Sequence, residues 1–168
     1  MSVMEIGNGM RPPAQLAIAM TAAVPSWPLL AIATLEFDGL DLHVRNSAIF
    51  ASDESDQRCL LAMVDDLTKF ANEQRIAKIL IQRGPSKGPQ PAAPLNQRHE
   101  AALMVVKGLK ADTVSSAKLA GWRNKHYPEL PEAPIDLPSR QHKLLGRAYA
   151  AAAYAIYAEI QERFVTCP

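Results

Sequence analysis

A chain of 168 residues, 48% hydrophobic and 21% charged, can bury one core but is too short for two ordinary domains. Its two cysteines have neither metal-ligand nor C-x-x-C spacing, and no apolar run reaches the ~18 residues of a membrane span, which argues against a zinc module, a disulfide scaffold and a membrane protein. The net charge of +1 is unevenly distributed along the chain: it is −6 over residues 1–68, +8 over residues 69–147 and −1 over residues 148–168. This asymmetry indicates either a surface for a polyanion or merely solvated charge.

The first segment, residues 1–28, contains a short apolar run at residues 16–24 that loosely resembles the core of a secretory signal. The positive flank of such a signal is poor, because only Arg11 stands against Glu5. We therefore expect a flexible or loosely packed leader over residues 1–28, a single domain over residues 29–168 and a cytoplasmic location, with a signal peptide as the alternative.

The next elements form the pattern of a hairpin followed by a helix and a strand. Residues 29–38 and 40–44 predict two strands joined by a turn at Gly39, and residues 47–50 could add a short third strand. Residues 57–74 have the apolar spacing of a helix with one buried face, and residues 76–81 have the length of a buried strand. We expect that strand to pair in parallel with residues 29–38, since the helix is long enough to be a crossover.

The second half continues with helices around one weak strand. Glycine and proline pairs make residues 84–94 a loop. Helices are predicted over residues 95–107, 117–125 and 140–164, and a weak strand over residues 111–116. The whole order predicts an α/β fold, a mixed sheet that opens with a β-hairpin and has helices packed on its faces.

One pair of carboxylates stands out. Glu36 and Asp38 are two apart on a predicted strand, so both point to one face. Such a pair repels unless a cation or a proton lies between its members, and hard divalent ions such as Mg²⁺ prefer oxygen ligands. The alternative is a solvated hairpin end in which Asp38 is a turn residue before Gly39.

Several cations suit a nucleic-acid backbone. Arg83, Lys87 and Arg98 flank or occupy the glycine- and proline-rich loop, which lacks the spacing of a P-loop. Arg123 lies among the aromatic and basic residues of 122–127, a pattern that suits base stacking with phosphate contact. A plain surface loop and an aromatic residue packed on the sheet explain these patterns nearly as well.

Three segments together resemble the ribonuclease H-like superfamily, the fold of ribonuclease H, RuvC-type Holliday junction resolvases and transposases. They are TLEFDGLDLHV at residues 34–44, IQRGPSKGPQPAAPLNQRHEAAL at 81–103 and KLLGRAYAAAAYA at 143–155. The nearest resemblance is to a small bacterial family of this fold. The resemblance implies that Glu100 is a functional glutamate. The position of Glu100 near the start of a predicted helix explains it equally well, because a carboxylate there interacts favourably with the helix dipole. The resemblance places Arg147 where active relatives carry a carboxylate, and Gln82 and Arg83 where a strand often ends in an acid.

Two functions follow from this resemblance. The first is a nucleic-acid-binding domain for DNA or RNA, in which a degenerate divalent-metal nuclease site uses Glu36 and Glu100 as metal ligands with Asp38 assisting. Arg147 would then contact phosphate, and binding of Mg²⁺ or Mn²⁺ would be loose because a guanidinium repels the ions. The alternative is a non-catalytic interaction or adaptor module on the same fold whose metal site has been lost, in which Arg147 would contact phosphate or neutralise Glu36. A third function is that of a protein-interaction domain that binds no nucleic acid. None of these functions involves a membrane.

Overall fold

The computed structural model describes residues 17–52, 57–84 and 96–165, which form five strands and four helices. The strands are β1 (Ile18–Ser26), β2 (Leu29–Phe37), β3 (Leu42–Ala51), β4 (Lys78–Arg83) and β5 (Lys110–Ser115). The helices are α1 (Gln57–Glu73), α2 (Asn96–Met104), α3 (Ser116–His126) and α4 (Ser139–Val165). The predicted loop at residues 84–94 lies outside the described residues except for Gly84. None of the described helices is long and apolar enough to cross a membrane.

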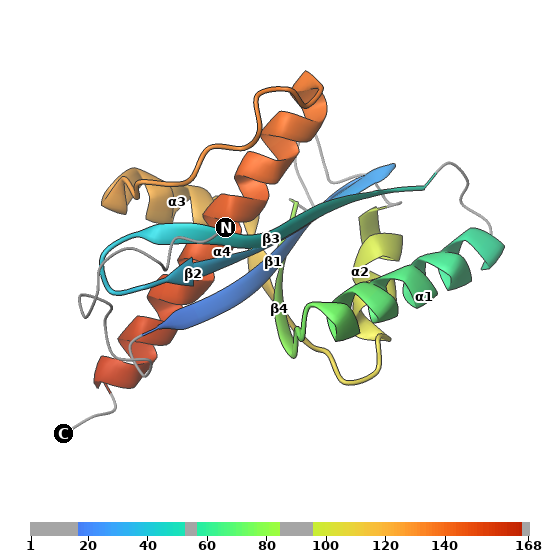
Figure 1. Cartoon of the computed structure of the whole chain (residues 1–168), viewed down its shortest axis with the longest axis horizontal. Coiled ribbons are helices and arrows are strands. Elements are labelled where there is room, and N and C mark those ends of the chain that lie inside the picture. Colours follow the sequence, from blue (N-terminus) through green and yellow to red (C-terminus); the bar gives the residue numbers. More distant parts are fainter. Residues whose placement is uncertain (1–16, 53–56, 85–95, 166–168) are drawn as a thin grey trace.

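All five strands form one sheet in the order β3-β2-β1-β4-β5 (Figure 1). β1 pairs antiparallel with β2, and β2 with β3, whereas β4 pairs parallel with β1 and β5 parallel with β4. The predicted mixed α/β sheet and the hairpin of β2 and β3 are confirmed. The predicted partner of β4 is wrong, because β4 lies beside β1 rather than beside β2.

The central strand of the sheet is β1, which lies inside the segment expected to be a loose leader. Ala22, Ala23 and Val24 in this strand are completely buried. The boundary expected at residue 28 is therefore wrong for residues 18–28. The small apolar side chains of this segment suggested weak structure. A strand that is covered on both faces carries such a continuous apolar run, because its side chains are buried on either side of the sheet.

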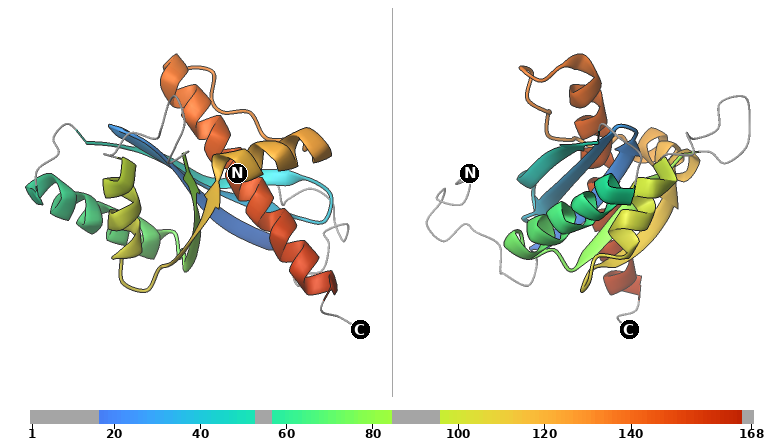
Figure 2. Two further views of the ribbon diagram at one scale, coloured as in Figure 1. Left: turned by 180° about the vertical axis from the view of Figure 1, so that it is seen from behind. Right: turned by 90° about the vertical axis from the view of Figure 1, so that its right-hand side faces the viewer.

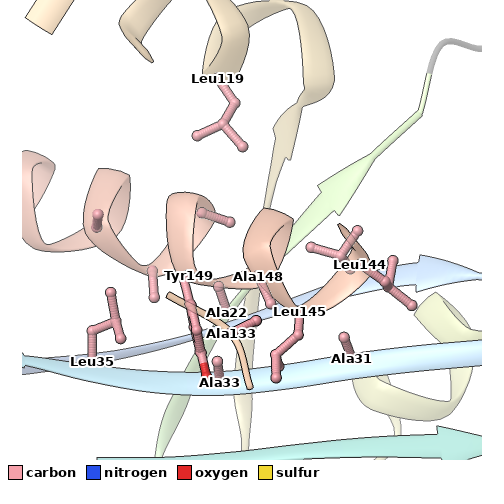
Figure 3. Close-up of a cluster of buried hydrophobic side chains, with 14 of the residues drawn as sticks. Ala22, Ala31, Ala33, Leu35, Leu119, Ala133, Leu144, Leu145, Ala148 and Tyr149 are labelled. Atoms are coloured by element: carbon pink, nitrogen blue, oxygen red, sulfur yellow. The ribbon is translucent and has the colours of Figure 1, made fainter. Parts of the chain in front are cut away.

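Helices cover both faces of the sheet (Figure 2). On one face, α4 packs on β1 and β2, where Ala148, Ala151 and Ala152 let the helix approach the strands closely (Figure 3). Tyr149 and Leu145 fill the space beside these alanines. On the other face, α1 and α2 cover a second cluster around Ile32 and Ile81.

Candidate functional site

The parallel strands end at a common edge of the sheet. From β1 the chain continues through β2 and β3 on one side, and then returns through α1 to β4 on the other side. This change of direction makes the crevice between β1 and β4 a topological switch point, the place where open α/β sheets bind ligands outside the carboxyl ends of their strands. We call this edge, with Ser26, Arg83 and Ser115 at the ends of β1, β4 and β5, the strand-end site.

The floor of the strand-end site is uncharged. Gln82 follows Ile81 and Val24 follows Ala23, the last two residues that pair β4 with β1 in register. Both side chains point toward α4, since Leu80 and Ala22, two residues earlier on each strand, pack in the α4 cluster. Val24 is fully buried and Gln82 is 6% exposed. The Oε1 atom of Gln82 has no hydrogen-bond partner in the described part of the chain.

The carboxylate of Glu100 at this edge is already paired. The Nε atom of Arg83 donates a 2.8 Å hydrogen bond to Oε2 of Glu100, which stands in the second turn of α2. The Arg83 side chain is 49% exposed and that of Glu100 is 13% exposed. Thus Arg83 presents its remaining N–H groups to solvent while it neutralises Glu100.

The turn between β1 and β2 is tied to two helices beside the site. Arg140 at the start of α4 donates to the carbonyl oxygens of Ser26 at 3.2 Å and Trp27 at 2.7 Å. The backbone N–H of Trp27 donates to Oδ1 of Asn96, the first residue of α2, at 2.7 Å. These contacts fix the ends of β1, α2 and α4 relative to one another.

A buried histidine packs under this turn. The ring of His99 lies 4.8 Å from that of Trp27, centroid to centroid, and is fully buried. Neither ring nitrogen has a hydrogen-bond partner among the described residues. Burial therefore lowers the pKa of His99 to about 4, and the ring is neutral at physiological pH. This makes His99 a packing residue rather than the solvated acid or base that an exposed ring would offer.

Glu36 and Asp38 lie at the opposite end of the sheet. Glu36 pairs in register with Ala19 near the start of β1, whereas Arg83 and its partner Glu100 lie at the far end. Pro25 lies six residue steps along β1 from Ala19, roughly 20 Å of chain. The structure therefore does not bring Glu36 and Glu100 together, and the expectation that they share metal ions is corrected.

Asp38 is a turn residue. Its Oδ1 atom accepts the backbone N–H groups of Leu40 and Asp41, both at 2.8 Å, and its Oδ2 atom hydrogen-bonds to Nε2 of His43 at 2.8 Å. The hydrogen bond from Asp41, then that from Leu40 and then that from His43 lower the pKa of Asp38 to about 2. All of these contacts serve the β2–β3 turn, and none reaches the strand-end site.

The residues of the strand-end site do not fit a two-metal centre. Such a centre needs several carboxylate oxygens converging on two ions, and the floor here offers Val24 and the amide of Gln82. The described residues contain no group of three or more His, Cys, Asp or Glu side chains able to hold a metal ion. Glu100, on the helix that covers the opposite face of the sheet, has its charge balanced by Arg83.

The other predicted cations are dispersed. Arg98 is half-buried in the first turn of α2, and Lys87 lies outside the described residues. Arg123 lines a shallow hollow on α3 together with Asn124 and the exposed Tyr127. Arg147 is exposed on α4, and its side chain forms no hydrogen bond or ion pair with the part of the chain that is described. Partial desolvation by its surroundings lowers the pKa of Arg147 from its ordinary value.

Sequence reasoning missed the residues that organise this edge. Arg140, Asn96 and Trp27 were not singled out, because the significance of each depends on β1 being the central strand. The only sequence signal for this strand was the run of small apolar residues at 17–25, followed by Trp27 and Pro28. The same run is equally typical of a leader segment.

Comparison of structures identifies the fold. RuvC from Thermus thermophilus superposes with a TM-score of 0.66 and 14% sequence identity, covering 85% of this chain and 96% of that one. T. thermophilus RuvC in complex with Holliday junction substrate gives a TM-score of 0.62 and 15% identity over the same shares. No family model matches the sequence, and no curated protein matches it significantly.

The mixed sheet with helices on both faces is thus a ribonuclease H-like fold. More particularly, the chain has the RuvC type of this fold, as its three sequence segments predicted.

Proposed function

We propose that this protein binds nucleic acid at the strand-end site and does so without the two-metal chemistry of a nuclease. The observation that carries the proposal is the half-exposed Arg83 at the end of β4, paired with Glu100 of α2, at a topological switch point. A carboxylate cluster at this place would attract metal ions. A half-exposed guanidinium beside the uncharged strand-end residues Val24 and Gln82 of the opposite face instead suits a phosphate group.

The charges around the crevice support this proposal. Arg83 ends β4 and Arg98 lies in the first turn of α2, and the sequence places Lys87 between these two elements. Each phosphate that such side chains contact releases bound counterions, so binding gains free energy that falls as salt rises. A separate hollow on α3 offers a further cation, Arg123, and the exposed ring of Tyr127, on which a base can stack.

The resemblance to RuvC supports nucleic acid as the ligand. One of the matched structures is named as a complex with a Holliday junction substrate, so that protein holds branched DNA on this fold. We expect the present chain to bind DNA or RNA on the corresponding edge, and we place this function in the cytoplasm, as its lack of any cysteine framework suggests.

Divalent metal has a minor role in this proposal. With Glu100 paired to Arg83 and no carboxylate on the floor among the described residues, any binding of Mg²⁺ or Mn²⁺ should be loose and should not be needed for nucleic-acid binding. Arg147, on the helix that covers Val24 and Gln82, would further oppose a cation there. We therefore expect no cleavage that depends on Glu36, Asp38 or Glu100.

A second candidate is the interaction module. Its support is a set of exposed apolar side chains on α1 and at the end of α2, namely Leu61, Met104 and Val105. Exposed apolar side chains that cluster on one side of a domain mark contacts with other proteins. Sedimentation of the wild-type protein and of a variant with Leu61→Glu and Val105→Glu tests this candidate, because a smaller sedimenting species for the variant would show that these residues bind protein.

Electrophoretic mobility and anisotropy measurements test the leading proposal. Labelled single-stranded, duplex and four-way-junction DNA and a single-stranded RNA should be titrated with the protein in EDTA and then in Mn²⁺. The proposal expects binding in EDTA and unchanged substrate lengths in Mn²⁺. Binding that appears only with Mn²⁺, or cleavage abolished by Glu100→Gln, would overturn it.

A further inference from the structure

A hollow lies at the other end of the sheet, away from the strand-end site. Its volume is about 220 Å³. It is bounded by the start of β1, by Thr34 of β2 and Arg45 of β3, and by the connection from α1 into β4. The lining residues are Ala19, Met20, Thr21, Thr34, Arg45, Gln74, Arg75, Ile76, Ala77 and Lys78.

The hollow exists because two parallel strands separate there. β1 and β4 are paired in register only at Ala22–Leu80 and Ala23–Ile81, although β1 begins four residues before Ala22. Toward their amino ends the strands no longer form a ladder. Met20 and Lys78 therefore border an opening into which backbone N–H groups and side chains can present hydrogen bonds.

One cation reaches the hollow through a β-bulge. The register between β2 and β3 passes from Leu35–Val44 to Thr34–Asn46, which leaves Arg45 as the extra, unpaired residue. A bulge of this kind re-aims the side chain of its extra residue. Arg45 is thereby brought to the lining of the hollow.

A second cation occupies a position that normally takes glycine. At the end of α1 the N–H of Ile76 donates to the carbonyl of Ala71 at 2.8 Å, and the N–H of Arg75 donates to that of Asn72 at 3.3 Å. This is the Schellman pattern, in which the residue at the position of Arg75 adopts a left-handed conformation and is usually glycine. Arg75 has φ 56°, so an arginine side chain is kept at a backbone position that disfavours it.

The remaining lining groups are hydroxyls and a third cation. A 2.7 Å hydrogen bond joins the Oγ1 atoms of Thr21 and Thr34 on neighbouring strands. Lys78, at the start of β4, is exposed. The side chains of Arg45, Arg75 and Lys78 form no hydrogen bond or ion pair with the described residues, and no Asp or Glu is among the described residues that line the hollow.

We propose that this hollow binds a phosphate group, held by Arg45, Arg75 and Lys78 and seated against the hydroxyls of Thr21 and Thr34. Three cations without carboxylate partners in the described part of the chain surround one concave site and attract an anion, and guanidinium groups match phosphate oxygens in pairs. The group would belong to a small phosphate compound or to the terminal phosphate of an oligonucleotide. The site is separate from the strand-end site, so it does not depend on the proposed nucleic-acid function.

Calorimetric titration with inorganic phosphate and with pyrophosphate tests the proposal directly. Arg45→Gln and Lys78→Gln should each weaken pyrophosphate binding by about tenfold, the typical effect of one charge-assisted hydrogen bond. Lys118→Gln, which removes one positive charge from α3, is the matched control and should bind as the wild type does. Equal weakening in all three variants, or no binding to the wild type at millimolar pyrophosphate, would overturn the proposal.

Arg75→Gly separates binding from folding. Glycine adopts the left-handed conformation freely, so this variant should melt at the same or a higher temperature while its pyrophosphate affinity falls by about tenfold. A variant that melts higher and binds pyrophosphate as well as the wild type would show that Arg75 does not contact the ligand.

Two further arms identify the source of the phosphate and distinguish this site from the strand-end site. If the natural ligand is a small compound, oligonucleotides with a 5′-phosphate and with a 5′-hydroxyl should compete equally with pyrophosphate. If the natural ligand is the end of a nucleic acid, only the oligonucleotide with the 5′-phosphate should compete well.

The double variant Arg83→Gln with Arg98→Gln should leave pyrophosphate binding unchanged. Loss of pyrophosphate binding in that double variant would contradict a separate site.

Discussion

The guanidinium of Arg83, at the end of β4, is held by the carboxylate of Glu100 on α2 through a 2.8 Å hydrogen bond from Nε to Oε2. In the proposed function, Glu100 lowers the positive charge that Arg83 offers to a phosphate group. Glu100→Gln keeps a hydrogen-bond acceptor for Arg83 but removes the negative charge. We expect it to raise the affinity for single-stranded DNA by about threefold to tenfold at low ionic strength, since phosphate repulsion is removed. Anisotropy titrations measure this change, and a fall in affinity would contradict the assignment.

The burial of His99 predicts a pH dependence of stability. Its pKa is lowered to about 4 in the folded protein, below the usual value of 6.5 that it regains on unfolding. Between these values the unfolded chain binds the proton more readily, so the contribution of His99 to stability is complete above pH 6.5 and is lost as the pH falls toward 4. The full loss is about 3 kcal/mol.

Urea denaturation at several pH values checks this dependence. The variant His99→Phe keeps a ring against Trp27 and cannot be protonated, so its stability should change less over the same pH range. Parallel pH profiles for the two proteins would show that His99 is solvated or paired, contrary to its burial.

Arg140 should stabilise the turn between β1 and β2. It donates to the carbonyl oxygens of Ser26 and Trp27 at 3.2 and 2.7 Å. Arg140→Ala should lower the free energy of unfolding by about 1–3 kcal/mol, the range for hydrogen bonds with a charged partner. Chemical denaturation measures the loss, and Lys143→Ala, a cation one turn further along α4, is the control expected to change little. Equal losses for both variants would argue against a specific role for the Arg140 contacts.

The close approach of α4 to the sheet depends on alanine. Ala151 is fully buried against the cluster that contains Ala22 and Ala33. Ala151→Leu should destabilise the protein by about 1–3 kcal/mol, because a filled core takes extra methylenes only by shifting its backbone or side chains. Ala158→Leu, at an exposed position of the same helix, should change stability little. A stable Ala151→Leu protein would show that space remains between α4 and β1.

Much of the fold was accessible from the sequence because most elements carry a local pattern. The apolar spacing in α1 and the alternation in β2 and β3 predicted those elements, and the alanine-rich α4 was expected to lie close to a sheet. β1 was missed because its alanines, Val24 and Thr21 carry no strand alternation. The reason is that the strand is buried on both faces, and missing it also misplaced β4 in the sheet.

The site was less accessible because it depends on pairing across the sheet. Glu36 and Glu100 were grouped because the resemblance to the ribonuclease H-like superfamily implied a functional glutamate at Glu100 and an acidic residue on the first strand of the hairpin. Once β1 precedes that hairpin, the end of β2 lies beside the start of β1, and Glu36 falls at the wrong edge to meet Glu100. Arg83 was identified as a cation beside the predicted loop, but its partner Glu100 is 17 residues further along the chain and no local pattern reports the pair.

The measurement that tests the central claim most directly is the salt dependence of nucleic-acid affinity in EDTA, for the wild type and for Arg83→Ala, Lys87→Ala and Arg98→Ala combined. The claim predicts that wild-type affinity falls steeply with rising KCl. It also predicts that the triple variant binds more weakly, with a slope flatter by about one unit for each phosphate that it no longer binds. Circular dichroism confirms that the variant is folded. A wild-type protein that binds no DNA or RNA at low salt, or a folded triple variant with unchanged affinity and slope, would contradict the account.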